Sequence, residues 1–216
     1  MIALLVTSVG ISLPIQPVIQ QETKSAPGSW PMLLKESVTE TGRQIELKNR
    51  EHAWFFPVRK SRAMAEKEQI NNGLLPDSLE VGTLIGCMVL DQNHGDFRGQ
   101  TIPAGSYSLH FGLQPVSDDH AETAPTRHFA IFVPIESNHF DPKPNQEKLF
   151  KQSTMITSKH PVVMPILPGT QAKSLRIAQI QSGIWALEYA FPVETPAGMA
   201  VLPLKLVIAG KSTAAK

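Results

Sequence analysis

Imidazole and carboxylate side chains gather between residues 91 and 128 of the sequence. His110 stands in an alternating segment, Asp118 and His120 follow in a polar stretch, and His128 opens the next apolar segment. Imidazoles and carboxylates are ligands that zinc, iron and manganese take in proteins. One hypothesis is therefore a metal site, whose candidate ligands are His110, Asp118, His120 and His128. No fixed spacing such as H-E-x-x-H accompanies them, and loop residues of these types are usually just solvated. The simpler interpretation gives the protein no metal and no other cofactor.

Other reactive groups give weaker signals. The single cysteine, Cys87, falls in an apolar segment, where a buried thiol has a raised pKa and is inert. There is no G-x-S-x-G nucleophile motif. Asp118 and Asp119 are adjacent, so in an extended chain they point to opposite sides, and their adjacency alone does not indicate an acid/base pair. The stretch 91–96 has its glycine and acids at the wrong positions for a calcium loop and fits a turn between strands. These patterns favour a protein without catalytic activity.

Two further residue types have alternative interpretations. Glu188 stands between two alanines of an alternating segment, which favours a solvated carboxylate over one that lines a groove. Trp54 and its aromatic neighbours could stack on a sugar, but core packing is the default for such residues. Carbohydrate binding through Trp54 is a third hypothesis.

Composition excludes several classes of partner. The 216 residues include 20 Lys and Arg against 19 Asp and Glu, so the net charge is +1 and nothing attracts nucleic acid. One cysteine excludes an intramolecular disulfide and a zinc site of several thiolates. A chain of this length can bury a self-sufficient core.

The N-terminal segment predicts export. Residues 1–21 carry no charged side chain, and residues 2–13 form an apolar run too short for a bilayer, which needs about 20 residues. Such a run, followed by Pro14 and Pro17, is typical of a secretory signal, although it lacks a preceding Lys or Arg and a clear cleavage site. The alternative is a buried N-terminal strand. We expect a signal peptide over 1–21, a linker over 22–31, one domain over 32–210 and a tail over 211–216, with no membrane span in the mature chain. A truncated start of the signal peptide would explain the missing Lys or Arg.

Short alternating segments dominate the rest of the sequence. In 105–113 the set Tyr107, Leu109, Phe111 and Leu113 alternates with small or polar residues, which predicts a half-buried strand. Residues 81–90 are apolar on both faces and predict a central strand. The strand 201–208 contains Pro203, which lacks an N–H donor, and therefore belongs at an edge or a bulge. Further strands are expected at 43–47, 53–58, 127–134, 162–167, 174–180 and 184–191, and short peripheral helices at 59–70 and 145–157. The expected fold is mostly β, a single antiparallel β-sandwich, with a barrel as the alternative.

The segment Ile102-Pro-Ala-Gly-Ser-Tyr-Ser-Leu109 resembles a turn-strand pattern, I-P-A-G-x-Y-x-L, of a family of uncharacterised exported bacterial β proteins. The resemblance covers roughly residues 81–134. It implies export and a β-sandwich, and it implies no activity. The residues also have a plain structural role, in which Pro103 fixes a turn, Gly105 supplies a positive φ and Tyr107 enters the core.

These observations together favour an exported periplasmic or extracellular protein that acts as an interaction or structural module of the cell envelope. Its expected partner is another envelope protein or a small ligand. The alternative is a metal-dependent enzyme or metal-binding protein that uses the loops around residues 91–128.

Overall fold

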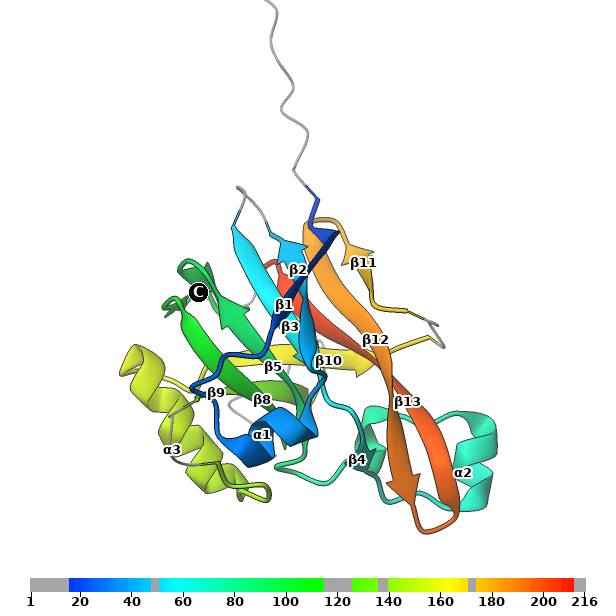
Figure 1. Cartoon of the computed structure of the whole chain (residues 1–216). Coiled ribbons are helices and arrows are strands. Elements are labelled where there is room, and N and C mark those ends of the chain that lie inside the picture. Colours follow the sequence, from blue (N-terminus) through cyan, green and yellow to red (C-terminus); the bar gives the residue numbers. More distant parts are fainter. Residues whose placement is uncertain (1–15, 48–50, 115–125, 136–139, 171–173, 212–216) are drawn as a thin grey trace, which may run out of the picture.

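A computed structural model describes residues 16–47, 51–114, 126–135, 140–170 and 174–211 (Figure 1). These residues are mostly β, as predicted. The strands are β1 (Val18–Ser25), β2 (Thr41–Glu46), β3 (His52–Pro57), β4 (Ser61–Arg62), β5 (Leu84–Leu90), β6 (His94–Gly95), β7 (Thr101–Ile102), β8 (Gly105–Leu113), β9 (His128–Pro134), β10 (Val163–Pro168), β11 (Arg176–Gln181), β12 (Ile184–Thr195) and β13 (Gly198–Ala209). The helices are α1 (Met32–Ser37), α2 (Lys67–Asn72), the 3-10 turn η2 (Pro76–Ser78) and α3 (Gln146–Thr157).

One large sheet organises the chain. Its strand order is β1-β2-β3-β5-β8-β9-β10-β13-β12-β11, and β4 pairs with β12 in parallel. The sheet curls into a half-barrel, and its two edge strands, β1 and β11, come into contact (Figure 1). Two separate sheets of a sandwich are not confirmed, because hydrogen bonding continues from one half of the sheet to the other through β10.

Strand β10 changes its partner at its midpoint. Val163, Met164 and Pro165 pair with β9, whereas residues 166–168 pair with β13. A proline has no N–H to donate to a ladder, so pairing is interrupted easily where Pro165 stands. The strand therefore turns the corner between the two halves of the sheet.

Buried aromatic side chains connect the two halves across the interior. The rings of Phe55 in β3 and Tyr189 in β12 meet edge to face with centroids 4.9 Å apart. The register of β5 shifts between Leu84 and Gly86, and the Tyr189 hydroxyl donates a hydrogen bond to the carbonyl of the intervening Ile85 at 3.0 Å. A bulge thus leaves a backbone acceptor free for a side chain from the opposite wall.

Strand β5 is buried at every position, which confirms the predicted central strand. The prediction of a half-buried strand at 105–113 is wrong, since β8 is buried on both faces from Tyr107 to Gly112. Its inner face joins the main core, and its outer face is covered by α3 and by the segment 140–145. Leu149 of α3 packs with Phe129, Ile131 and Val133 of β9 in a separate small core on that outer side.

Helix α3 matches the predicted helix at 145–157. Asn145 caps it, since its side chain accepts a hydrogen bond from the Lys148 N–H at 2.8 Å. The predicted helix at 59–70 is wrong over its first half, where β4 forms, and only α2 is helical. Helix α1 was not predicted, and β1 forms where the end of the leader and a linker are expected. Residues 1–15 lie outside the described part, so the leader itself stays a prediction.

Two expectations about turn residues have specific outcomes. Pro203 pairs with Ala190 of β12, but it lies one residue beyond Leu204, the last residue of β13 that pairs with β10. Strand β13 is interior rather than an edge, and it carries a bulge where its register with β12 shifts beside Trp185 and Ala186, away from Pro203. The Pro203 carbonyl accepts a hydrogen bond from the N–H of Gly169, just past β10, at 3.1 Å. Gly105 does not have a positive φ. A Cβ there would lie 3.3 Å from the Tyr107 hydroxyl, which instead donates to the Pro103 carbonyl at 2.8 Å.

No helix in the described part of the chain is long and apolar enough to cross a membrane.

Candidate functional site

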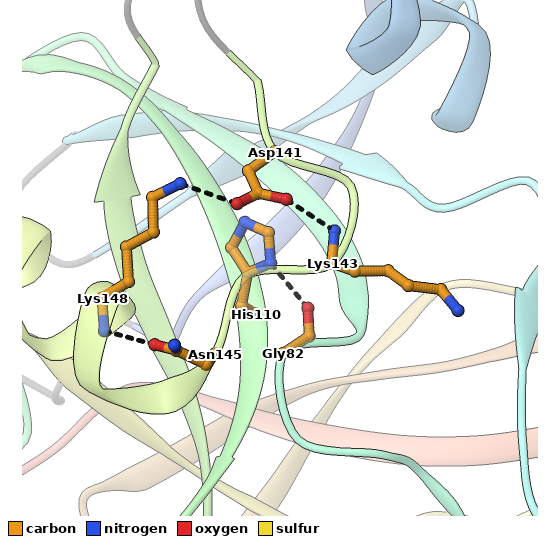
Figure 2. Close-up of polar contacts among 6 residues, drawn as sticks. All are labelled: Gly82, His110, Asp141, Lys143, Asn145 and Lys148. Atoms are coloured by element: carbon orange, nitrogen blue, oxygen red, sulfur yellow. Dashed lines mark hydrogen bonds and ion pairs between the residues drawn. The ribbon is translucent and has the colours of Figure 1, made fainter.

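The polar residues of β8 lie on the outer face of the sheet, where α3 and residues 140–145 cover them. Ser108 and His110 lie on the same face of β8, below α3 and residues 140–145, and both are buried. This burial corrects the solvent-exposed face that the half-buried strand prediction implies for His110. Figure 2 shows the His110 ring between the Gly82 carbonyl and the Asp141 carboxylate.

Both ring nitrogens of His110 have partners. Nδ1 lies 2.9 Å from the carbonyl oxygen of Gly82, and Nε2 lies 3.0 Å from the hydroxyl of Ser108. A carbonyl can only accept, so Nδ1 carries the proton and Nε2 accepts from Ser108. Burial lowers the pKa of His110 to about 4, against the smaller raising effects of the Gly82 hydrogen bond and the Asp141 charge. The imidazole is therefore neutral at ordinary pH.

Asp141 holds the segment over His110 in place. One carboxylate oxygen accepts the N–H of Lys143 at 3.0 Å, and the other accepts from the Lys148 ammonium of α3 at 2.7 Å. Pro142 and Pro144 flank Lys143 and fix its neighbours' φ angles. The Lys143 side chain points away from His110, as Figure 2 shows.

Ser108 and His110 have the hydrogen bond of a nucleophile and its base, and the Gly82 carbonyl orients the ring. Two features argue against that chemistry. The space beside the pair has a volume of only about 30 Å³, enough for water and too small for an acyl substrate. A histidine with a pKa of about 4 is also a weak base at neutral pH.

A larger cavity lies next to this pair and shares Phe140 and Pro144 with it. Its volume is about 220 Å³. Three segments form its walls: residues 58–62 with β4, residues 80–84 before β5, and residues 140–144 before α3. Ser37 at the end of α1 completes it.

Backbone hydrogen bonds fix two of the three walls of the cavity, and Asp141 holds the third through its side chain. The Arg59 N–H donates to the Ser37 carbonyl at 2.9 Å, and the Ala63 N–H donates to the Glu194 carbonyl of β12 at 3.0 Å. The Gly82 N–H donates to the Phe111 carbonyl of β8 at 2.8 Å. The walls 58–62 and 80–84 are thus tied to α1 and to the large sheet.

Gly82 lets two of these walls meet. Its φ is +90°, and a Cβ there would lie 2.1 Å from the Pro144 carbonyl oxygen. We expect Gly82→Ala to lower the free energy of unfolding by about 3 kcal/mol, through left-handed strain and the forced separation of the two segments. Gly183 has a φ of +76° with no atom near its missing Cβ, so Gly183→Ala is the matched control and should cost about 1 kcal/mol. Urea unfolding of both variants measures the difference, and equal losses would contradict the proposed contact.

The candidate metal ligands are not brought together within the described residues. Strand pairing places His128 opposite Leu113, three positions from His110, so the two histidines lie on opposite faces of the sheet. His128 stacks on Phe111 and hydrogen bonds to Asp77 at 2.8 Å. Across the described residues, no three His, Cys, Asp or Glu side chains gather as metal ligands do. Asp118 and His120 lie outside those residues, so a site that uses them stays a prediction.

Other candidate residues have structural roles. Cys87 is fully buried, and burial raises the pKa of its thiol. Asp96 accepts the N–H groups of Arg98 and Gln100 within the predicted turn. Trp54 is buried and donates to Asp91 at 2.8 Å. That burial favours core packing for Trp54 over a sugar platform.

The expectation of a solvated Glu188 is wrong. Its carboxylate is 0% exposed and accepts hydrogen bonds from the Thr170 hydroxyl at 2.7 Å and from the Arg176 side chain. Burial alone would raise the pKa of Glu188, but the hydrogen bonds from Thr170 and Arg176 and the Arg176 charge together lower it. Arg176 pairs with Glu188 in the β11–β12 register, a neighbour that alternation within one strand does not reveal.

No sequence pattern predicted a functional role for Asp141, Lys143 or Arg62. Arg62 fell inside a predicted helix, and Lys143 stood in a loop with no motif around it. The alternation of Pro142 and Pro144 around Lys143 was the only local signal, because it marks a segment of fixed backbone.

Comparisons with protein-family models, with curated proteins and with solved structures gave no match. The class of this protein is therefore described from its fold and its candidate site. It is a mostly β protein with one large, curled and mostly antiparallel sheet and a small cavity beside its helix-covered face.

Proposed function

We propose that this chain is an exported, non-catalytic binding protein of the cell envelope, periplasmic or extracellular, and that the cavity between residues 58–62, 80–84 and 140–144 binds a small ligand. The observation that carries the proposal is the cavity of about 220 Å³, whose walls are held by backbone hydrogen bonds and by the side chain of Asp141. A preformed site avoids the cost of ordering its walls when a ligand binds. The I-P-A-G-x-Y-x-L pattern and the apolar N-terminal run support export.

The non-catalytic part of the proposal rests on burial. Ser108, His110 and Cys87 are the described residues that best fit roles as nucleophile or base, and all three are buried. The cavity wall presents lysine, arginine, serine and threonine side chains and one carboxylate, that of Glu80. A few polar groups of this kind bind and orient a ligand.

The binding site is tested by filling it. Val81 lines the cavity and is 37% exposed, so Val81→Trp should fold while it occupies the ligand space. Val201 on β13 is exposed outside the cavity lining, which makes Val201→Trp the matched control. In a thermal-shift screen of small metabolites, we expect compounds that stabilise the natural protein and the control by about 1.4 kcal/mol at ten times Kd. Val81→Trp should lose that stabilisation, and its retention would place the ligand elsewhere.

The absence of catalysis is tested on the same protein. A fluorophosphonate probe reacts with activated serines, and we expect no labelling because Ser108 is enclosed and its partner is a weak base. Labelling that disappears in Ser108→Ala would overturn this part of the proposal. Fractionation of bacteria that express the full chain tests export separately.

A further inference from the structure

We infer that the cavity takes a small organic anion, with Arg62 and Lys143 binding its carboxylate or phosphate group. This inference rests on the proposed function, since it concerns the ligand of the same cavity. It depends on the charges of the walls, on which of those charges already have partners, and on the backbone that holds them.

Positive side chains predominate around the cavity. Lys60, Arg62 and Lys143 line it against a single carboxylate, that of Glu80. Lys60 forms an ion pair with Glu194 at 3.2 Å and is largely neutralised. Among the described residues, the Arg62 guanidinium and the Lys143 ammonium make neither an ion pair nor a hydrogen bond. The two cations without partners therefore come from two different walls of one cavity.

The backbone on both walls is fixed. Arg62 belongs to β4, where it pairs with Glu194 of β12. Lys143 lies between two prolines and its N–H is bound by Asp141. An arginine offers a planar pair of N–H donors to two oxygens of a carboxylate or phosphate, and a lysine adds a point charge. Because the main chains of Arg62 and Lys143 are already fixed, binding costs less backbone entropy than it would for residues of a free loop.

The remaining lining indicates what the anionic group is attached to. Ser61 and Thr83 offer hydroxyls, while Val58, Leu84 and Phe140 offer apolar surface. The volume of about 220 Å³ is below the roughly 300 to 1,000 Å³ of sites for drug-sized ligands. The fitting occupant is a small anion with a compact apolar or ring-shaped body.

Four matched aromatic probes separate charge from shape: benzoate, phenyl phosphate, neutral benzamide and cationic benzamidine. By calorimetry at low salt, we expect the two anions to bind at least tenfold more tightly than the other two.

Arg62→Gln and Lys143→Gln should each weaken anion binding about tenfold, the effect of a lost charge-assisted hydrogen bond. Lys159→Gln removes an exposed lysine outside the cavity and should change nothing. Glu80→Gln should strengthen anion binding. A preference for phenyl phosphate or for benzoate identifies the source of the anionic group.

The outcomes distinguish a failure of the anion inference from a failure of the proposed binding function. If benzamide and benzamidine bind as tightly as benzoate, or if Arg62→Gln and Lys143→Gln leave affinity unchanged, the anion inference is overturned. Should Val81→Trp still abolish binding of whichever probes bind, the cavity remains the ligand site. If Val81→Trp has no effect on any bound compound, the proposed function itself fails. Circular dichroism and thermal unfolding confirm that each variant is folded.

Discussion

Acidification from pH 6.5 to pH 4 will remove about 3 kcal/mol from the free energy of unfolding through His110 alone. Burial holds the pKa of His110 at about 4 in the folded protein, against an ordinary value of 6.5. The unfolded chain therefore takes up a proton first as the pH falls, and protonation favours unfolding. The stabilisation is complete above pH 6.5 and is lost progressively down to pH 4, at 1.36 kcal/mol per pKa unit.

His110→Gln isolates this effect. A glutamine amide can donate to the Gly82 carbonyl and accept from Ser108, and it does not titrate. Urea unfolding at half-unit steps should give a shallower pH dependence between 6.5 and 4 for His110→Gln than for the natural protein. His160 is exposed, so His160→Gln should keep the natural slope. Parallel slopes for all three proteins would show that His110 is accessible to protons in the folded state.

Loss of the Arg176 side chain will destabilise the protein more than its exposed position suggests. The Arg176 side chain is 54% exposed, but its partner Glu188 is 0% exposed, with 2.6 Å between the two charged groups. Arg176→Met leaves a buried carboxylate with only Thr170 as a hydrogen-bond donor, although Lys205 lies opposite on β13. We expect a loss of about 3 kcal/mol at pH 7, because an uncompensated buried charge is costly.

A double variant tests whether the buried charge is the cause. Arg176→Met combined with Glu188→Leu removes both groups and should recover most of the stability lost in Arg176→Met. Lys60→Met breaks the exposed ion pair with Glu194 and should cost less than about 1 kcal/mol. Since the pKa of Glu188 is lowered, the stabilisation is present above the usual glutamate pKa and disappears as the pH falls through the folded value. Additive losses in the double variant would contradict this account.

The strands were largely predictable because each depends on its own alternation. β5 was recognised by apolar residues on both faces, and α3 by its position after two prolines. Alternation within β8 correctly separated Leu109 and Phe111 from Ser108 and His110. It could not show that α3 would cover the second group, because that contact joins segments about 40 residues apart. β1 was missed since its polar side chains, all outside the core, give no apolar period.

The candidate site was less predictable for the same reason. His110 was recognised as a residue of interest, but its partners Gly82 and Asp141 come from two distant segments. The cavity draws on residues as far apart in the sequence as Ser37 and Pro144, and its cations, Arg62 and Lys143, stand in short segments without a motif. Composition could only state that the whole chain is nearly neutral, which conceals a local excess of positive charge.

The change of partner in β10 has a consequence for how the chain folds. During synthesis β9 is made before its partner β10, so one edge of β9 stays unpaired. That edge can pair only after α3 and residues 163–165 have been synthesised. Residues 129–133 of β9 are apolar and buried in the finished protein, so the waiting edge is a template for wrong pairing between chains. Joining the two halves depends on contacts between residues far apart in the sequence, which are slow to form. Folding intermediates that end before β10 should therefore be the ones that aggregate.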